Sequence, residues 1–366
     1  MSIPSDAGDS IDPQEIAHGG DAAATAAEPE AEPEAEPAPV PTKKRRRWLR
    51  VTLWSLVVVA LIAAGGVVGL RLYLKSVENK VARVDAFAEV VESERPTKPP
   101  ETTKAMNILI LGSDSRNPDL DGSRTDTIML AHVTADHKAA QMVSIPRDTW
   151  LDIPRAGNGH GGVKAKINAA FAWGGIPLMV RTVEQYTKVR IDHVVVIDFE
   201  GFAAVVDKLG GIDIDVEKNF TSIHPPYRKF SAGMQHLNGA EALDYSRQRK
   251  QFSNGDFSRI KHQQQVIKAI LAKATSAGIL TDPGKLNAFL TATASAISAD
   301  KNFDLIGTAM DLRGIPSNKI RFITNPTTGT GWEGNQSVVY ANKPVAATLF
   351  AAINNDTAAT WQPPKS

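Results

Sequence analysis

The chain has no cysteine among its 366 residues. This absence excludes disulfide bonds, thiolate metal sites and cysteine nucleophiles, and it fits an extracytoplasmic protein. The sequence also lacks a Gly-Lys-Ser/Thr phosphate loop and a Gly-x-Ser-x-Gly nucleophile elbow. Aromatic residues make up only 6%, and the six tryptophans are dispersed, so no stacking pattern for nucleic acid is present. We therefore expect no nucleic-acid partner.

Positive charge is absent from the first part of the chain. Residues 1–42 hold ten acidic residues, no Lys and no Arg, and their Ala-, Glu- and Pro-rich composition predicts a disordered tail. Six basic residues follow in 43–50. A basic cluster on this side predicts that the tail is cytoplasmic and that residues 71–366 are extracytoplasmic.

Charge of either sign is absent from residues 51–70, VTLWSLVVVALIAAGGVVGL. At about 1.5 Å per residue this stretch would span the roughly 30 Å of a bilayer core. A buried core helix seldom lacks every charge over such a length, and the apolar core of a signal peptide is shorter and nearer the N-terminus. The stretch therefore predicts a single transmembrane helix in the cell membrane, with membrane lipid as a partner.

The rest of the chain reads as a stalk and one domain. Residues 71–104 are predicted as a stalk or linker, 105–356 as the main domain and 357–366 as a C-terminal tail. The predicted strands are 106–111, 127–133, 140–145, 193–198, 211–216, 319–324 and 337–340. The predicted helices are 166–173, 177–189, 200–209, 239–244, 257–277, 285–298, 303–311 and 344–354. Several strands are continuously apolar, which indicates an α/β fold: an α/β/α layered domain with a central mixed sheet.

Opposed charge is concentrated in GSDSRNPDLDGSRTD, residues 112–126, between two predicted strands. Asp114 follows the first strand and Asp126 precedes the second, so pairing of the strands would bring both carboxylates to one sheet edge. Two close carboxylates repel unless a proton or a cation intervenes, and oxygen ligands suit Mg²⁺ or Mn²⁺. The alternative is that these side chains only cap local turns.

Basic side chains near other predicted element ends favour an anionic ligand. Arg147 ends a strand, Arg247 and Arg249 share a face if YSRQRK is extended, and Arg259 and Gln263 share a helical face. Arg124, Lys164 and Lys166 add further cations. A divalent cation with several guanidinium groups is suited to a pyrophosphate. For any single arginine, a surface salt bridge is the competing interpretation.

Eight motifs in order resemble the LytR-CpsA-Psr family of cell-wall glycopolymer ligases. They are NILILGSDSR, SRTDTIML, SIPRDTW, KINAAFAWGG, VVVIDFEGF, LGGIDIDV, HLNGAEALDYSRQRK and GDFSRIKHQQ. The similarity is clear over roughly residues 105–275 and weaker to about 355. The predicted anchor with its short cytoplasmic tail also fits this family.

The resemblance implies a membrane-anchored phosphotransferase. Such enzymes transfer a glycopolymer from a polyprenyl-pyrophosphate carrier to peptidoglycan through a phosphodiester bond, with Mg²⁺ and with side pyrophosphatase activity. The motifs place the metal ligands at Asp114 and Asp126, the catalytic residues at Asp114, Arg147 and Arg247, and a channel for the lipid between sheet and helices. The pyrophosphate-binding residues they imply are Arg124, Arg147, Arg247, Arg249, Arg259, Gln263 and either Lys164 or Lys166.

Three further expectations concern His262, the source and its polymer, and the alternative functions. His262 stands where the family often has arginine, and we expect it on the helix surface. The Ala-rich composition and acidic tail suggest an actinobacterial source, for which the family context makes arabinogalactan the expected polymer. The alternatives are a non-catalytic protein that binds or senses the lipid-linked glycan, and a transcriptional attenuator, which the predicted topology disfavours.

Overall fold

The computed structural model describes residues 55, 56, 59, 81–113, 125–252 and 254–364. The chain divides into two compact units, residues 1–63 and 64–366, and all the described residues from 81 onward belong to the second. Within the described ranges, no helix combines the length and the apolar character needed to cross a bilayer. The predicted cytoplasmic tail and basic cluster lie outside the described residues, as does the predicted transmembrane helix except at those three positions.

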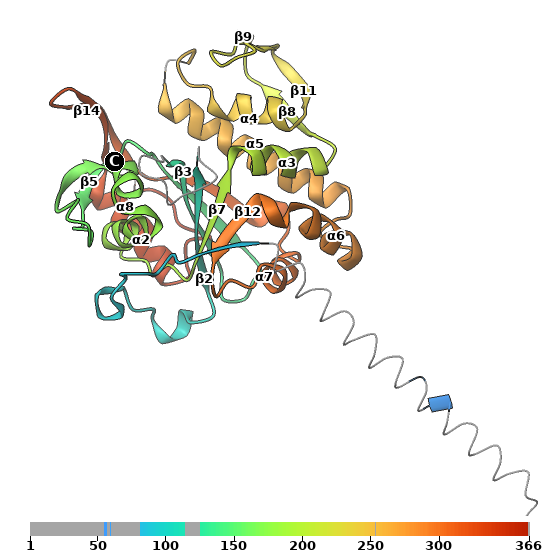
Figure 1. The fold of residues 1–366 in the computed structure, drawn as a ribbon, viewed down its shortest axis with the longest axis horizontal. Coiled ribbons are helices and arrows are strands. Elements are labelled where there is room, and N and C mark those ends of the chain that lie inside the picture. The colour runs from blue at the N-terminus through green and yellow to red at the C-terminus, as the bar shows by residue number, and fades with distance from the viewer. Residues whose placement is uncertain (1–54, 57–58, 60–80, 114–124, 253, 365–366) are drawn as a thin grey trace, which may run out of the picture. The chain divides into compact units, whose positions relative to one another are not determined.

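A seven-stranded mixed sheet forms the centre of the domain (Figure 1), as the sequence predicts. Its order is β1-β12-β7-β2-β3-β4-β13. Strand β2 pairs antiparallel with β3 and parallel with β7, while β4 pairs parallel with β13. The bounds are β1 Ala82–Val84, β2 Met106–Ser113, β3 Thr125–Val133, β4 Ala140–Ile145, β7 His193–Asp198, β12 Ile297–Asp300 and β13 Ile320–Thr324.

Helices cover both faces of this sheet. Successive side chains of a strand point to opposite faces, so Leu109 and Leu111 of β2 join one apolar core with α2 and α8, while Ile108 joins another with α6 and α7. The layered arrangement follows from these two cores. The helices are α2 Asn168–Thr187, α3 Phe199–Lys208, α4 Gly239–Arg247, α5 Asp256–Ser276, α6 Pro283–Thr293, α7 Leu305–Leu312 and α8 Lys343–Asn354.

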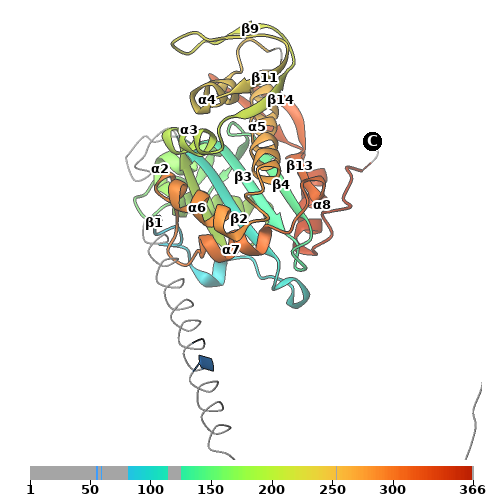
Figure 2. The same cartoon turned by 90° about the vertical axis from the view of Figure 1, so that its right-hand side faces the viewer.

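Among the residues that the structure describes, four two-stranded ribbons lie outside the central sheet. The ribbon of β8 and β11 packs with α3, α4 and α5 around a third apolar core, above the sheet in Figure 2. The predicted strand at 211–216 therefore exists, but it belongs to this ribbon. The bounds are β5 Trp150–Ile153 with β6 Val163–Lys166, β8 Ile212–Val216 with β11 Gly233–Leu237, β9 Phe220–Thr221 with β10 Lys229–Phe230, and β14 Thr327–Glu333 with β15 Gln336–Ala341.

The prediction of a helix over 285–298 is wrong at its C-terminal end. Helix α6 stops at Thr293, and β12 begins at Ile297, where it pairs with β7 on one side and β1 on the other. An apolar run of this length suits a buried strand as well as a helix, so periodicity alone did not separate the two. Pairing within the sheet decides the outcome. By contrast, the break between the helices predicted at 166–173 and 177–189 coincides with the non-helical Gly174 and Gly175 inside α2.

Part of the predicted stalk is packed against the domain. Strand β1 is an edge strand of the sheet, and Arg95 donates hydrogen bonds to the buried carboxylate of Glu184. Lys98 contacts the Asp192 carboxylate at 2.5 Å. Polar side chains that look solvated in a Pro-rich segment thus serve as partners for buried groups. Residues predicted as a C-terminal tail also pack, since Ala358 is fully buried.

Strand pairing brings the motif-bearing segments to one edge of the sheet, namely the line along which β2, β4 and β7 end and β3 begins. Ser113 at the end of β2 pairs with Thr125 at the start of β3 and with Asp198 at the end of β7. Ile145, at the end of β4, pairs with Ile128. The residues that follow or precede these positions therefore gather at the same edge, where the candidate site lies.

Candidate functional site

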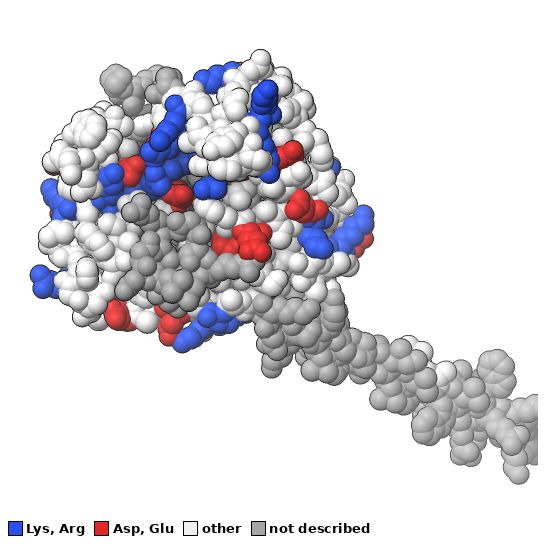
Figure 3. Space-filling model, turned by 45° about the horizontal axis from the view of Figure 1, so that its top comes forward, with Lys and Arg blue, Asp and Glu red and all other residues white. Residues whose placement is uncertain are grey.

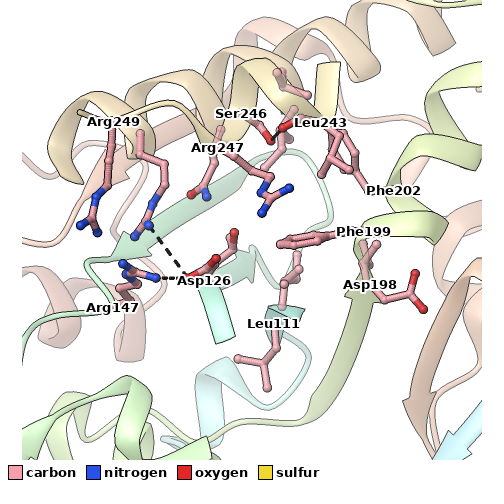
Figure 4. Close-up of a pocket in the computed structure, with 18 of the residues that line it drawn as sticks. Leu111, Asp126, Arg147, Asp198, Phe199, Phe202, Leu243, Ser246, Arg247 and Arg249 are labelled. Atoms are coloured by element: carbon pink, nitrogen blue, oxygen red, sulfur yellow. Dashed lines mark hydrogen bonds and ion pairs between the residues drawn. The ribbon is translucent and has the colours of Figure 1, made fainter. Parts of the chain in front are cut away.

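A cavity of about 500 Å³ opens at this sheet edge, between the central sheet and helices α3, α4 and α5. Its size is that of a small-molecule site. Figure 4 shows two chemically different ends: Asp126, Arg147 and Arg249 lie together, while Phe199, Phe202 and Leu111 lie apart from them. Lys and Arg side chains also gather on the outer face seen in Figure 3, with Asp and Glu among them.

Asp126 is the centre of the charged end. Its Oδ1 atom accepts a hydrogen bond from Arg147 and lies 3.9 Å from the Nη1 atom of Arg259. Arg259, with a side chain only 5% exposed, contacts the Asp256 carboxylate at 2.5 Å. Asp256 also lies 3.9 Å from Arg147. Two carboxylates thus hold two guanidinium groups in one partly buried cluster.

Burial and charge oppose each other in this cluster. Burial lowers the pKa of Arg147, but the nearby Asp126, Asp148 and Asp256 carboxylates outweigh it, so the pKa is raised. Burial is also the largest influence on Asp256 and raises the pKa of that carboxyl above its ordinary value. An arginine remains charged at any pH of interest. Burial lowers the pKa of Arg259, and the charges of Arg147 and Arg249 act in the same direction, whereas the Asp256 and Asp126 carboxylates act against it. The carboxylates of the cluster thus offset part of the repulsion between its arginines.

Arg247 and Arg249 line the cavity from the end of α4. The helix begins with a capping box between Asn238 and Glu241 and ends at Arg247, whose guanidinium lies 4.5 Å from the centre of the Phe199 ring. Gln248, between the two arginines, is extended and fully buried. Arg247 and Arg249 therefore line the same cavity, and the residue between them is extended whereas Arg247 ends the helix.

The buried amide of Gln248 fixes the turn that carries these arginines. Its Nε2 atom donates to the Ser222 hydroxyl at 2.8 Å and to the Asp244 carboxylate at 2.7 Å. The Ser222 hydroxyl donates to the same carboxylate at 2.6 Å. The other Asp244 oxygen makes no hydrogen bond but lies 3.5 Å from the Arg228 guanidinium, and a buried polar network of this kind favours one backbone conformation. The network thus positions Arg247 and Arg249 without touching the cavity.

Helix α5 contributes Arg259 and Gln263 to the cavity. The neighbouring Gln264 donates hydrogen bonds to Ser144 at 3.0 Å and to Thr324 at 3.3 Å, which ties the helix to β4 and β13. Gln263 and Arg259 are four residues apart and therefore point to the same side of the helix. The predicted shared face of these two residues is present.

The other end of the cavity is apolar. Its walls come from the sheet, from α3 and α4, and from the middle of α5, together with the loop after β9. The apolar lining residues are Ile110, Leu111, Met142, Ile197, Phe199, Phe202, Val205, Ile223, Leu243, Val266, Ile267 and Ile270. Sequence reasoning predicted a channel between sheet and helices but did not name its lining.

Several predicted site residues are placed differently or lie outside the described residues. Asp114 and Arg124 are among the latter. Lys166 contacts the Asp148 carboxylate at 3.3 Å and so joins the cluster, whereas Lys164 is exposed on the same ribbon and does not line the cavity. Of the two lysines left open by the sequence, the structure brings Lys166 nearer to the arginines.

The predicted magnesium site is represented only by Asp126. No group of three or more His, Cys, Asp or Glu able to hold a metal occurs among the described residues. Magnesium in phosphoryl-transfer sites takes one or two carboxylates together with phosphate oxygens. Asp126 at the charged end of the cavity fits that role once a phosphate ligand is present, with Asp114 as the second ligand predicted from sequence.

His262 is not on the helix surface, contrary to prediction. Its side chain is fully buried between the rings of Tyr245 and Phe252, with ring centroids 4.5 and 4.6 Å away. Burial lowers the pKa of His262, although the Glu217 carboxylate 3.6 Å away acts in the opposite direction. The helix face that carries the histidine is covered by the β8–β11 ribbon and its loops, a tertiary contact that one helical segment does not reveal.

Three residues of the site were missed by sequence reasoning. Asp256 and Asp148 hold the arginines, and Gln248 fixes the turn between two of them. Asp256 lies three residues before Arg259, which is the spacing of an ion pair along a helix, so that signal was present in the sequence. The role of Gln248 depends on Ser222, which is distant along the chain.

Comparison with known proteins gives consistent results. A model of the LytR_cpsA_psr family matches residues 70–354. The polyisoprenyl-teichoic acid–peptidoglycan teichoic acid transferase TagU of Bacillus mycoides is 31% identical over 263 residues, which cover 70% of this chain and 82% of TagU. The corresponding transferase TagV of Bacillus subtilis is 34% identical over 233 residues, covering 62% of this chain and 59% of TagV.

Solved structures show the same fold. The crystal structure of Bacillus subtilis TagV superposes with a TM-score of 0.60 at 27% identity, over 69% of this chain and 97% of that one. The LytR-Csp2A-Psr enzyme from Actinomyces oris superposes with a TM-score of 0.57 at 22% identity, over 75% and 96% of the two chains. The second comparison concerns the fold alone.

Proposed function

The chain belongs to the LytR_cpsA_psr family, and from that membership and the cavity we propose that it transfers a glycopolymer from a polyprenyl-pyrophosphate carrier to peptidoglycan. The observation that carries this proposal is the joining of an arginine cluster and an apolar groove in one cavity. A polyprenyl pyrophosphate has the same two parts. Relatives named as teichoic acid transferases to peptidoglycan support the proposal.

The reaction is a displacement at the phosphorus that bears the sugar. A hydroxyl oxygen of the acceptor forms a bond to that phosphorus, the bridging P–O bond of the pyrophosphate breaks, and polyprenyl monophosphate leaves. The hydroxyl proton passes to solvent or to a carboxylate, for which we propose Asp114 on the basis of sequence alone. A loose transition state makes little demand on a base, so charge stabilisation carries most of the catalysis.

Four arginines supply that charge stabilisation. Arg147 and Arg259 lie at the charged end, and Arg247 and Arg249 line the cavity from the adjacent turn. Guanidinium groups bind phosphate oxygens in a bidentate manner. We assign Arg147 and Arg247 as catalytic, and Arg249, Arg259 and Gln263 as pyrophosphate-binding. Asp126 pairs with Arg147 and Arg259, so a bound pyrophosphate would compete with the Asp126 carboxylate for the N–H donors of these two arginines.

We propose magnesium as the cofactor. Magnesium held by Asp126 and Asp114 would neutralise charge on the pyrophosphate. The same centre would hydrolyse the pyrophosphate slowly when water replaces the acceptor. The predicted anchor over 51–70 would keep the domain next to the lipid substrate, outside the cell. Arabinogalactan is our proposal for the polymer, and teichoic acid, the polymer in the names of the relatives, is the alternative.

The experiment supplies full-length protein in detergent with a polyprenyl-pyrophosphoryl glycan and peptidoglycan strands. We expect polyprenyl monophosphate and a phosphodiester-linked glycan product, and we expect both to disappear with EDTA and in Arg247→Ala. Arg313→Ala, a change outside the cavity on an exposed side chain, is the matched control and retains activity. Tight binding of the lipid-linked glycan with no product in any acceptor series would contradict the transferase and favour the non-catalytic binding protein.

A further inference from the structure

The β14–β15 ribbon rises from the same sheet edge as the cavity. β13 ends at this edge beside β4, where the backbone N–H of Asn325 donates to the Ser144 carbonyl at 2.8 Å, and β14 follows two residues later. On the returning strand, the N–H of Val339 donates to the carbonyl of Asp148 at 2.9 Å. Asp148 also contacts Arg147 and Lys166, so the base of the ribbon is attached to the charged cluster.

The outer part of the ribbon has an unusual surface. Residues 327–341 contain one charged side chain, Glu333, in a chain in which 22% of residues are charged. Exposure alternates along β14, and Trp332 presents a side chain that is 70% exposed on the same face as the exposed Thr330. Opposite Trp332 lies the exposed Ser337. An exposed ring among hydroxyl groups suits a sugar, which offers C–H faces and hydroxyls.

The ribbon is braced so that this ring stands clear of the domain. The Tyr340 ring lies over Gly331, where a Cβ atom would come within 2.4 Å of it, and the Tyr340 hydroxyl donates to Glu333 at 3.0 Å. Trp332 is five residues beyond the start of β14, which corresponds to about 16 Å along an extended strand. Figure 1 shows the ribbon projecting beyond the layers near β5. A glycan strand of the acceptor that is bound to Trp332 would therefore approach the cavity from the solvent side.

The geometry of the proposed reaction requires an acceptor on this side. In an in-line displacement the attacking oxygen and the leaving oxygen lie on opposite sides of the phosphorus. The aromatic part of the apolar lining that would hold the departing lipid lies toward β7 and α3, at Phe199 and Phe202, while the rest of this lining extends over the sheet and along α5. The ribbon follows β13, at the other end of the strand order. The charged cluster lies between them.

The position of the ribbon disfavours a lipid surface as its ligand. β1, which lies within the segment predicted as the stalk and follows the predicted anchor, is one edge strand of the sheet, and β13 is the other. Trp332 therefore lies in the ribbon that follows β13. In the order of the sheet, β13 is the strand farthest from β1, where the chain enters from the predicted anchor. A tryptophan anchored in the membrane interface would be expected near that entry point.

We propose that the β14–β15 ribbon is the docking surface for the glycan strand of the acceptor, with the Trp332 ring as its platform. This inference rests on the proposed function. It assigns the donor to the cavity and the acceptor to the ribbon, so the two substrates have separate sites on one chain. Release of polyprenyl monophosphate to water requires only the first site, whereas transfer requires both.

The test compares full-length Trp332→Ala with wild type in two assays. In the transfer assay, with soluble peptidoglycan glycan strands as acceptor, we expect the KM for the strands to rise roughly five- to tenfold, as for loss of one aromatic contact. In the hydrolysis assay without acceptor, we expect no change in the release of polyprenyl monophosphate. Trp332→Phe should recover most of the affinity. Met234→Ala, which removes another exposed apolar side chain (71% exposed) on β11, is the matched control.

A third measurement separates failure of this inference from failure of the proposed function. Direct binding of the glycan strands is measured by calorimetry without a donor, so it does not depend on turnover. Weaker binding by Trp332→Ala than by Met234→Ala supports the ribbon. If Trp332→Ala binds the glycan strands as wild type does and has the same KM, the proposed role of the ribbon is overturned even if wild type transfers glycan. It is also overturned if Trp332→Ala binds phospholipid vesicles more weakly but still binds the glycan strands. Wild type without release or transfer instead overturns the proposed function.

Discussion

Asp256 holds the charge cluster together at the scale of single residues. Its side chain is 12% exposed and contacts Arg259, which is 5% exposed, while Arg147 lies 3.9 Å away. Loss of one partner of a buried pair leaves the other charge uncompensated. Both arginines are aimed at the cavity, so the same carboxylate serves stability and function.

Asp256→Ala is therefore predicted to lower the free energy of unfolding by about 3–5 kcal/mol. Urea unfolding followed by circular dichroism measures this change. Asp311→Ala removes an exposed carboxylate from α7 and should stay within about 0.5 kcal/mol of wild type. Equal stability of the two variants would show that Arg259 does not depend on its ion pair.

His262 predicts a pH dependence of stability. Burial lowers its pKa below 6.5, so the folded state favours the neutral ring and the unfolded state binds the proton more readily. The stabilisation is complete above pH 6.5 and is lost as the pH falls below that value. His262→Phe should reduce the decline in unfolding free energy on acidification, whereas the exposed His160→Gln should leave it unchanged. Identical slopes for all three proteins would contradict this assignment.

At this scale the sequence predicted the types of site residue better than their partners. Arg147, Arg247, Arg249, Arg259 and Gln263 all line one cavity. Their spacing relative to strand ends and along a helix carries that information. The partners that hold them come from distant segments, as with Ser222 and Gln248, and pairing of this kind depends on tertiary structure.

Among the elements, the turn after α4 is the one whose conformation matters most to the site. Gln248 bonds Ser222 and Asp244, and the loop that follows Ser222 contributes Ile223 and His224 to the cavity wall. One buried amide thus joins the wall to the two arginines that flank it.

Gln248→Met keeps the length of the side chain and removes its amide. Because misplacement of catalytic groups by about 1 Å costs up to a hundredfold in rate, we expect turnover to fall roughly ten- to a hundredfold. The free energy of unfolding should fall by about 1–3 kcal/mol, since Asp244 loses a donor. Both are measured against Gln185→Met, an exposed site on α2. A loss of stability without loss of turnover would show that the network is structural only.

Elements were predicted well where one pattern dominates. The predicted bounds of β4 and β7 agree with the structure, because both are short, mainly apolar runs bounded by polar or turn residues. The ribbon strands β5, β6, β9, β10, β11 and β14 were missed, since most of them are short and β14 consists largely of Thr and Gly. The first two residues of β12 fall in the predicted helix over 285–298, because their extended conformation depends on pairing with β7 and β1.

For the whole molecule, the boundary of the folded domain lies earlier than the sequence suggests. Residues 81–104 contribute an edge strand and the Arg95 guanidinium, which bonds the buried Glu184. The Pro-rich composition that suggests a linker is compatible with a segment that wraps a domain. The layered fold itself was predictable, because continuously apolar strands require helices on both faces.

A chain that begins at residue 105 should therefore be less stable than one that begins at residue 81. The expected difference is about 3–5 kcal/mol, because Glu184 is left as a buried charge without Arg95. Urea unfolding of the two chains measures it, and Glu184→Gln should recover part of the loss in the shorter chain. Equal midpoints and slopes would contradict the assignment of 81–104 to the domain.

Formation of polyprenyl monophosphate tests most directly whether the cavity is the centre of a polyprenyl-pyrophosphate phosphotransferase. The measurement uses full-length protein, a polyprenyl-pyrophosphoryl glycan and Mg²⁺, and it compares wild type with Arg147→Ala and with Arg321→Ala, an arginine that bonds C-terminal carbonyl groups away from the cavity. We predict product from wild type and Arg321→Ala and almost none from Arg147→Ala. Equal product from all three proteins, or none from wild type, would contradict this role of the cavity.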